Sequence, residues 1–370
     1  MATVPELFGS SAPVLTVDSE RSAALARDLL RLEVSEDTQG MKRLVARFTA
    51  WGPGPGGDNE GWLHLDGSEI DFGKRIDVSL GPAAAARTVF SGRISAIETE
   101  LREGVEPQLV LHAEDALMDL RWEHRCKTFE DSSDADIVRH IAAEHGLTAQ
   151  VDADGPTHKV VQQWNQSDLA FLRERARLLQ AEIWLEDRTL NFATRSRRPA
   201  PELTLVNGNE AGGVAANKLI ALSARADLAH QRSEVHVAGY DVAARERIDE
   251  SADSGDVQAE AGPGRLGMDL LGQAFQRFKS HRLREVPLTS EVASAWARAE
   301  MLRRARGFVR IRGQTNGSPE MVVGSNLRLE GVGPMFGGSR YRVTQLTHSY
   351  DLLHGHRTAF EAERPHLEAA

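Results

Sequence analysis

Two groups of histidines have side chains and spacing that could bind a metal ion. His140, Glu144 and His145 fall within one predicted helix, where His and Glu on one face can hold zinc. A zinc-protease helix needs H-E-x-x-H or H-x-x-E-H, however, and one residue too many separates His140 from Glu144. His354 and His356 flank a glycine in a predicted turn, with no third ligand evident. The sequence therefore predicts no metal site.

Motifs for a nucleophile or a phosphate group are also missing. Cys126 has no nucleophile signature around it, and no G-x-S-x-G elbow occurs. The glycine-rich stretch at residues 51–57 lacks the G-K-[S/T] ending of a phosphate-binding loop and does not open a helix. We therefore expect no catalytic residue, no cofactor and no enzymatic activity.

Some basic and aromatic residues could contribute to binding. The basic clusters are Arg195-Ser196-Arg197-Arg198 and Arg303-Arg304-Ala305-Arg306. Such clusters are usually solvated faces, and in an assembly they could fix the register of an interface. Trp51 and Trp62 border the glycine-rich loop and are candidates for an aromatic platform that binds carbohydrate.

The composition limits the possible partners. The 370 residues include 44 Lys and Arg against 54 Asp and Glu, a net charge of −10, which disfavours nucleic acid and anionic lipid. A single cysteine excludes an intrachain disulfide. The N-terminus lacks a signal-peptide pattern and no run of about 18 apolar residues occurs, so we expect cytoplasmic synthesis and no membrane anchor.

Alternation of apolar and polar residues predicts β-structure in two separate parts of the chain. The first part covers residues 29–115, and the second covers 201–240 together with 308–363. Between them, a capping box at Ser133–Asp136 begins a predicted helix that ends near Gly146.

A second helix and a hairpin complete a small α+β module. The helix begins at Ser167 or Asp168, and the hairpin covers residues 183–192. In the second β region we expect a mobile polar loop at 249–264, followed by helices near 266–278 and 290–306.

The two β regions also align with each other. Arg93–Glu98 falls on Arg342–Thr347 and, with the same offset, Gln108–Glu114 falls on Arg357–Glu363. Phe72–Val78 falls on Val323–Leu329 at an offset two residues longer, with a shared glycine, whereas Leu44–Phe48 matches Phe308–Arg312 only in β character. The order and spacing favour a duplicated barrel domain, although two unrelated antiparallel barrels of similar size could also align this well.

Two long stretches carry a resemblance to a known family. They consist of residues 127–138, 144–147, 161–172 and 183–187, and of residues 307–313, 323–333, 336–351 and 355–360. Their order resembles the phage late control protein D family, the baseplate hub proteins of contractile tails and injection systems, which are similar to the hub portion of VgrG proteins.

The resemblance implies a mainly β fold with an α+β insert. We expect a first tube-like β-barrel domain at 1–120, an α+β domain at 121–200, and a second tube-like barrel at 201–370 with a helical insertion at about 241–307. Three chains would form a homotrimeric ring of six similar barrels that joins a sixfold tail tube to a threefold spike. The resemblance implies that this particle is a phage tail or an injection system, with assembly in the cytoplasm.

Larger relatives continue into an OB-fold and a β-helical needle, whereas this sequence ends at Ala370, so the resemblance implies a separate spike protein. Tail tube and baseplate wedge proteins are the other implied partners. The alternatives are a baseplate-associated cell-wall hydrolase and a carbohydrate-binding tail component.

Overall fold

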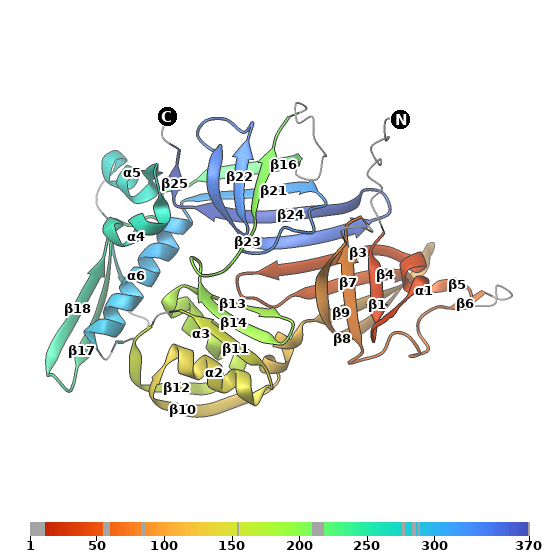
Figure 1. Ribbon diagram of the computed structural model, residues 1–370, viewed down its shortest axis with the longest axis horizontal. Coiled ribbons are helices and arrows are strands. Elements are labelled where there is room, and N and C mark those ends of the chain that lie inside the picture. The colour runs from red at the N-terminus through yellow and green to blue at the C-terminus, as the bar shows by residue number, and fades with distance from the viewer. Residues whose placement is uncertain are drawn as a thin grey trace, which may run out of the picture.

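The computed structural model describes residues 12–54, 60–82, 86–153, 155–208, 218–275, 278–282, 286–287 and 289–368. Within these ranges the chain is mainly β, as the alternating sequence predicts. A 13-stranded sheet dominates the molecule, with an α+β module and a further lobe beside it (Figure 1).

The N-terminal part of the sheet is called the first β unit. Its strands are β1 (Val14–Val17), β2 (Glu20–Arg21), β3 (Leu29–Asp37), β4 (Arg43–Thr49), β7 (Arg75–Leu80), β8 (Arg87–Arg102) and β9 (Val105–Glu114). They pair in the order β3-β4-β9-β8-β7-β1, and helix α1 (Ala23–Asp28) connects β2 to β3. Alternate residues such as Leu32, Phe48 and Ile76 form one buried apolar cluster.

The C-terminal part of the sheet is called the second β unit. Its strands are β15 (Glu202–Val206), β16 (Leu219–Ala226), β21 (Val309–Asn316), β22 (Asn326–Glu330), β23 (Gly338–Asp351) and β24 (Gly355–Arg364). They pair in the order β16-β21-β24-β23-β22-β15 and have a buried cluster of their own, which includes Ile311, Tyr341 and Phe360.

The two units have the same strand order, and their long hairpins β8–β9 and β23–β24 have the same register near the aligned arginines. The outermost pairs differ, since β1 is antiparallel to β7 whereas β15 is parallel to β22. Arg93 lies opposite Glu114 in the first unit, and the aligned residues Arg342 and Glu363 lie opposite each other in the second. Both hairpins also shift register at the same aligned point, after Ile94 in β8 and after Val343 in β23. The register of the strands therefore agrees with the alignment of these sequences.

The shared glycine has the same role in both units. Gly73 and Gly324 have positive φ angles of 77° and 92°, which a glycine adopts without steric cost. The Gly73 N–H donates to the carbonyl of Ile94 at 2.9 Å, and the Gly324 N–H donates to that of Val343 at 2.8 Å. The glycine thus turns the chain into β7 in one unit and into β22 in the other.

One aligned segment is in the wrong frame. Arg43 in β4 lies opposite Glu114, and Arg310 in β21 lies opposite Glu363, so Leu44 corresponds to Ile311 and not to Phe308. Alternation of apolar and polar residues identifies a strand but does not fix its register. The register of β4 and β21 is known only from the strands that they pair with.

The two units join edge to edge and form no separate closed barrels. β23 pairs with β3 from Gln345–Asp37 to Asp351–Arg31, and Figure 1 shows these blue and red strands side by side. Among the described strands the sheet does not close, with β16 at one end and β2 at the other, and a single isolated bridge joins Val206 at the end of β15 to Lys218 just before β16. The expected pair of barrels is therefore replaced by one continuous sheet over two cores, because β23 occupies the edge of β3.

The α+β module lies between the two units in the sequence. After the 3₁₀ helix η1 (Ala116–Arg121) it contains β10 (His124–Ser133), α2 (Asp134–Glu144), β11 (Thr148–Asp152), β12 (Thr157–Ser167), α3 (Asp168–Leu179), β13 (Ala181–Glu186) and β14 (Thr189–Thr194). The predicted capping box at Ser133 and Asp136, the second helix and the hairpin are confirmed. The sequence patterns did not predict the long antiparallel pair of β10 and β12.

The insertion in the second unit is a mixed lobe, not a purely helical one. It contains β17 (Glu234–Asp241), β18 (Glu246–Ala252), α4 (Ser254–Ala261), β19 (Arg265–Leu266), α5 (Gly267–Ala274), β20 (Lys279–Arg282) and α6 (Ser290–Arg306), and β19 pairs with the C-terminal β25 (His366–Leu367). The predicted helix at 290–306 is confirmed. The mobile loop expected at 249–264 is wrong, because Asp253 and Asp256 form a capping box that begins α4 and Val257 is fully buried.

Candidate functional site

A network of buried ion pairs connects four parts of the chain. Arg198, with a side chain only 5% exposed, donates to Glu182 of the α+β module at 3.1 Å and to Glu36 of β3 at 3.2 Å. Arg195 pairs with Glu182 at 3.3 Å and with Glu363 of β24. One short segment after β14 therefore links the α+β module to both β units.

The insert joins the same region through Arg306 of α6. Its guanidinium donates to Glu260 of α4 at 2.8 Å and to Gln180 at the end of α3 at 3.2 Å. Arg198 also lies 4.3 Å from the ring centroid of Trp184, a cation–π contact that holds it in place.

These findings correct the expectation that both basic clusters are solvated. Arg198 and Arg306 are buried and Arg195 is only 14% exposed, and all three are paired inside the molecule, whereas Arg197 and Arg303 lie at the surface. The acidic partners come from distant parts of the sequence, so no local pattern indicates which arginines become buried.

The arginines of the network favour the ionised form of Glu182. Burial acts to raise the pKa of Glu182, but Arg195, Arg198 and Arg342 outweigh it and hold that pKa below its ordinary value. Burial, with the neighbouring arginines, lowers the pKa of Arg342 to about 10 even though Glu182 opposes the shift.

A cleft of about 800 Å³ opens beside this network, lined by residues of β15, β22, β23, α4 and α6. The Nε and Nη2 atoms of Arg342 are buried here and have no hydrogen-bond partner among the described residues. The Nη2 atom lies 4.0 Å from the carboxylate of Glu182. The lining of the cleft is therefore predominantly basic, with six arginines and three glutamates.

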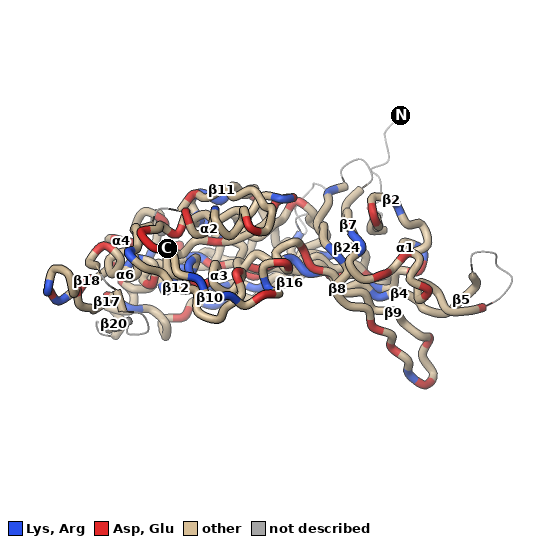
Figure 2. Tube along the Cα trace, turned by 90° about the horizontal axis from the view of Figure 1, so that it is seen from below, with Lys and Arg blue, Asp and Glu red and all other residues tan. Residues whose placement is uncertain are grey.

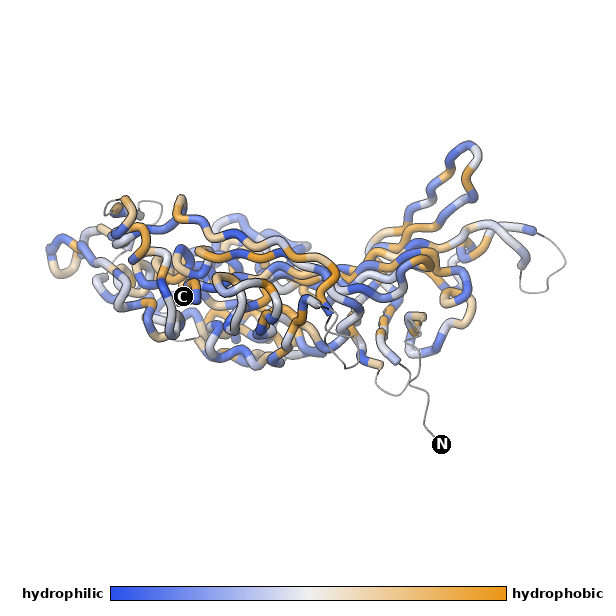
Figure 3. The backbone as a smooth tube through the Cα atoms, turned by 90° about the horizontal axis from the view of Figure 1, so that it is seen from above, coloured by the Kyte–Doolittle hydropathy of each residue, from blue (hydrophilic) through white to orange (hydrophobic). Residues whose placement is uncertain are grey.

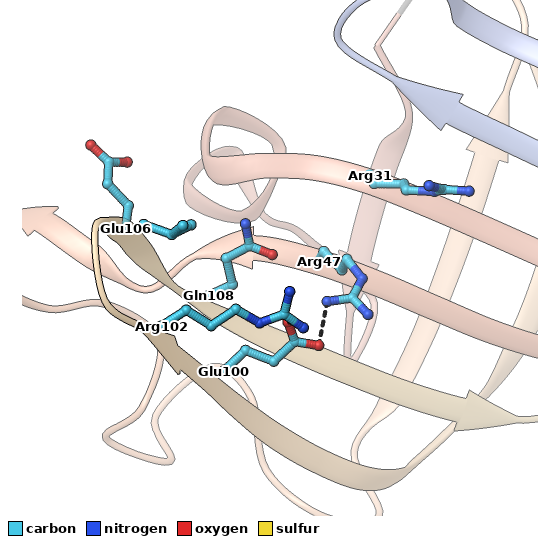
Figure 4. Close-up of a pocket in the computed structure, with 7 residues that line it drawn as sticks. Arg31, Arg47, Glu100, Arg102, Glu106 and Gln108 are labelled. Carbon is cyan, nitrogen blue, oxygen red and sulfur yellow. Dashed lines mark hydrogen bonds and ion pairs between the residues drawn. The ribbon is translucent and has the colours of Figure 1, made fainter.

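A second, smaller groove of about 340 Å³ lies on the first β unit. It is lined by Arg31, Arg47, Glu100, Arg102, Val105, Glu106 and Gln108. Figure 4 shows Arg47 donating to Glu100, at 2.6 Å, and Arg102 approaches the same carboxylate at 3.4 Å. These charges are partly or fully exposed and paired with one another, which is typical of a polar surface and not of a catalytic centre.

The structure separates the histidines that the sequence placed together on α2. His140 is exposed and 3.4 Å from Glu144, whereas His145 turns to Asp168 at 2.8 Å. Glu144 is itself paired with Arg125 and Lys127. This group consists of structural ion pairs.

His354 and His356 also point to different partners. His354 is held by Asp351 at 3.1 Å in the β23–β24 turn. His356 lies 3.3 Å from His348, which is buried on β23 and was not singled out in the sequence. Burial lowers the pKa of His356 to about 4. Burial, together with the nearby His356, lowers the pKa of His348 to about 3. Both imidazoles are therefore neutral at pH 7.

Within the described ranges, the structure has no group of three or more His, Cys, Asp or Glu arranged as metal ligands. No helix in the described part of the chain is both long and apolar enough to span a bilayer.

The remaining sequence candidates lie on the surface. Cys126 is exposed on β10, directly opposite Trp164 of β12. Trp51 and Trp62 pair across the short hairpin of β5 (Trp51–Pro53) and β6 (Glu60–Trp62), with rings edge to face at 5.4 Å between centroids. The rings contact each other and do not form one flat platform. Residues 55–57 of the glycine-rich stretch lie outside the described residues.

Three hairpins project from the molecule. Figures 2 and 3 show the β8–β9 hairpin extending well beyond the rest of the first unit, with β5–β6 near it and β17–β18 at the opposite end. Large apolar side chains are exposed on all three of them, namely Leu101 and Val105 on β8–β9, Trp51 and Trp62 on β5–β6, and Tyr240 and Val242 on β17–β18.

Comparisons with solved structures match this fold along almost the whole chain. The 43 kDa tail protein of prophage MuSo2 from Shewanella oneidensis has a TM-score of 0.67 and 12% identity, covering 96% of this chain and 98% of its own. The tail protein from Neisseria meningitidis MC58 has a TM-score of 0.65 and 13% identity, covering 95% and 96%. The chain thus has the fold of phage tail proteins.

A further structure is the c3393 protein of Escherichia coli, described as a component of the type VI secretion system with structural similarity to the T4 tail proteins gp27 and gp5. It has a TM-score of 0.57 and 14% identity, covering 95% of this chain and 76% of its own. No curated protein sequence matches the chain. Residues 65–351 match the family model described as the Alg8 N-terminal domain, and the chain therefore belongs to the Alg8 N-terminal domain family.

Proposed function

We propose that this protein is a structural baseplate hub subunit of a contractile phage tail or injection system, of the late control protein D type. Three copies form a ring that joins a sixfold tail tube to a threefold spike. The protein acts by binding the tube, the spike and other baseplate proteins, and it has no enzymatic activity.

The observation that carries this proposal is the repeated register of the two β units. Each chain contains two units of one strand order, joined edge to edge through β3 and β23. In a threefold assembly, two similar units per chain present six similar faces, which is what a sixfold tube requires of a threefold partner.

The tandem organisation belongs to the same proposal. We assign residues 1–120 and 201–370 to two tube-wall domains that arose by duplication, and residues 121–200 to the α+β domain. The ion pairs of Arg195 and Arg198 support a rigid arrangement, since they hold both β units against one module.

The related structures support the biological setting. Two are described as tail proteins and a third as a type VI secretion component, and these assignments concern those proteins. The exposed hairpins and the paired charges of the groove fit a protein whose surfaces bind other proteins.

The test is the position of the chain in purified tail or injection particles. An epitope placed after Val242, at the exposed tip of the β17–β18 hairpin, would be labelled with antibody and imaged. We expect label only at the baseplate end, at the junction of tube and spike. Label along the whole tube, or particles without the chain, would contradict the proposal, and so would lysis of cell-wall suspensions by the isolated protein.

A further inference from the structure

Several strands of the sheet, among them β2, β15, β16 and the end of β8, have one edge unpaired in the described residues. An isolated bridge joins Val206 to Lys218, just before β16 begins. β16 pairs with β21 on one side only, and the C-terminal half of β8, residues 96–102, pairs with β9 only. Unpaired edges present rows of backbone N–H and C=O groups and are templates for adding another strand.

The edges of β16 and β8 each have a paired counterpart in the other β unit. β16 corresponds to β3: Leu219 and Leu29 lie opposite Thr315 and Phe48, and the register shifts after each of them. The end of β8 corresponds to the end of β23 in the frame that aligns Arg93 with Arg342, and β8 has one further register shift, between Glu100 and Arg102, that β23 lacks. Those two counterparts, β3 and β23, pair with each other inside the chain.

Side chains on the paired strands β3 and β23 are more buried than their counterparts on the unpaired edges of β16 and β8. Tyr350 at the end of β23 is only 8% exposed and packs into the apolar cluster of the first unit, whereas its counterpart Leu101 on β8 is 63% exposed. Leu32 of β3 is fully buried, and its counterpart Leu222 on β16 is half-buried. The open edges thus leave uncovered the positions that the internal junction buries.

From this correspondence we infer that β8 of one copy adds to β16 of the next copy, in the register of the internal β3–β23 junction. The occupant of each edge is a second copy of this chain, and the inference rests on the proposed hub function. Transferring the internal register pairs Glu98 with Arg225, Thr99 with Ala224, Glu100 with Ser223 and Leu101 with Leu222.

The transferred register is chemically complementary. Glu98 lies opposite Arg225, which is 77% exposed and whose guanidinium has donors to spare beyond its bond to Asp227. Leu101 lies opposite Leu222, and no like charges face each other directly among these pairs. Opposite charges and apolar pairs directly across two strands each contribute about 0.2–1 kcal/mol, so this register favours association.

The proposed β16–β8 contact uses a different surface on each of the two copies. Such head-to-tail contacts can repeat from copy to copy until they close a ring. With two units per chain, each ring then alternates internal β3–β23 junctions with β16–β8 junctions between copies. Both junctions bury the same strand positions.

Disulfide cross-linking tests the register. In a Cys126→Ser background, which removes the exposed native thiol, one variant carries Glu98→Cys with Arg225→Cys and another carries Leu101→Cys with Leu222→Cys. Directly opposite residues of an antiparallel pair lie about 4.5–5.5 Å apart at Cα, within the range that a disulfide spans. The matched control combines Leu101→Cys with Arg225→Cys, which lie three positions out of register and on opposite faces.

We expect both in-register variants to form reducible cross-links between copies, roughly tenfold more than the control under the same oxidant. No cross-link in either in-register variant, or equal cross-linking in the control, overturns the inference. A trimer by light scattering without in-register cross-links leaves the hub function standing and rejects this interface. In-register cross-links that produce an open ladder, with no discrete three-chain band, keep the interface and reject the trimeric hub.

Discussion

Arg198 is the residue on which the contact between the α+β module and the first β unit most depends. It is buried between Glu36 and Glu182, which are themselves almost fully buried. Charges removed from water are tolerated only when they are paired, so the loss of this guanidinium leaves Glu36 with only the more distant Lys42, 3.7 Å away.

Arg198→Met is therefore expected to destabilise the protein by about 3–5 kcal/mol, measured as a shift of the urea unfolding midpoint at pH 7. The matched control is Arg197→Met, because Arg197 is 59% exposed and lies 3.7 Å from Asp152. An exposed pair of this kind contributes about 0–1 kcal/mol. Equal losses of unfolding free energy in the two variants would show that the buried ion pairs of Arg198 do not hold the α+β module against the first β unit.

The sequence could not have distinguished these neighbours. Arg197 and Arg198 are adjacent in one basic cluster, and only the tertiary contacts with Glu36 and Glu182 decide which is buried. The same limit applies to His348, which is buried beside His356 although nothing in its local pattern marks it.

At the level of elements, local signals predicted local structure. The capping box at Ser133 and Asp136 located α2, and apolar spacing located α6 at residues 290–306. A similar capping box at Asp253 and Asp256 begins α4. This capping box did not predict a helix from the sequence, because the residues around it are polar and indicate a loop.

Pairing between distant strands was predictable only where the chain repeats itself. The alignment of Arg93 with Arg342 placed two hairpins in one frame, which the structure reproduces. The junction of β3 with β23 has no signal in either strand, because alternation does not specify a partner. The expectation of two closed barrels failed for that reason.

The β23–β24 hairpin makes the stability of the second unit sensitive to acid. Burial lowers the pKa of His348 to about 3 and that of His356 to about 4, both below about 6.5 in the unfolded chain. Their stabilising contribution is present above pH 6.5 and is lost as the pH falls toward 4 and 3. Each histidine can add up to about 1.4 kcal/mol per pH unit to the slope of unfolding free energy.

Replacing both histidines with glutamine should therefore flatten the dependence of the urea midpoint on pH between 7 and 4. His354→Gln is the control, since His354 is exposed in the turn beside Asp351. A double variant that loses stability with acid as steeply as the native chain would contradict buried, neutral histidines at this position.

On the scale of the whole molecule, the account depends on edges that one chain leaves open. Two β units joined through β3 and β23 still expose β16 and the end of β8 among the described strands. A chain of this kind is expected to be soluble but to associate, and its association should respond to charges at those edges.

Exchanging the charges of one proposed pair tests this dependence. Glu98→Arg or Arg225→Glu alone should lower the association constant up to about fivefold per contact, since a charged pair contributes about 0.2–1 kcal/mol, and the double exchange should recover part of it. Glu246→Arg, an exposed glutamate on the β17–β18 hairpin, should leave association unchanged. The measurement is sedimentation over a range of concentrations. Glu98→Arg and Glu246→Arg raise the net charge by the same amount, so equal effects of these two variants would indicate only a change in net charge.

The central claim is that this chain works as a ring of three. The most direct measurement is the mass of the purified native protein by light scattering coupled to gel filtration, repeated with spike and tube proteins added. The account predicts a discrete species of three times 40.6 kDa for the chain itself. A mass of 40.6 kDa at every concentration, with and without those partners, would contradict it.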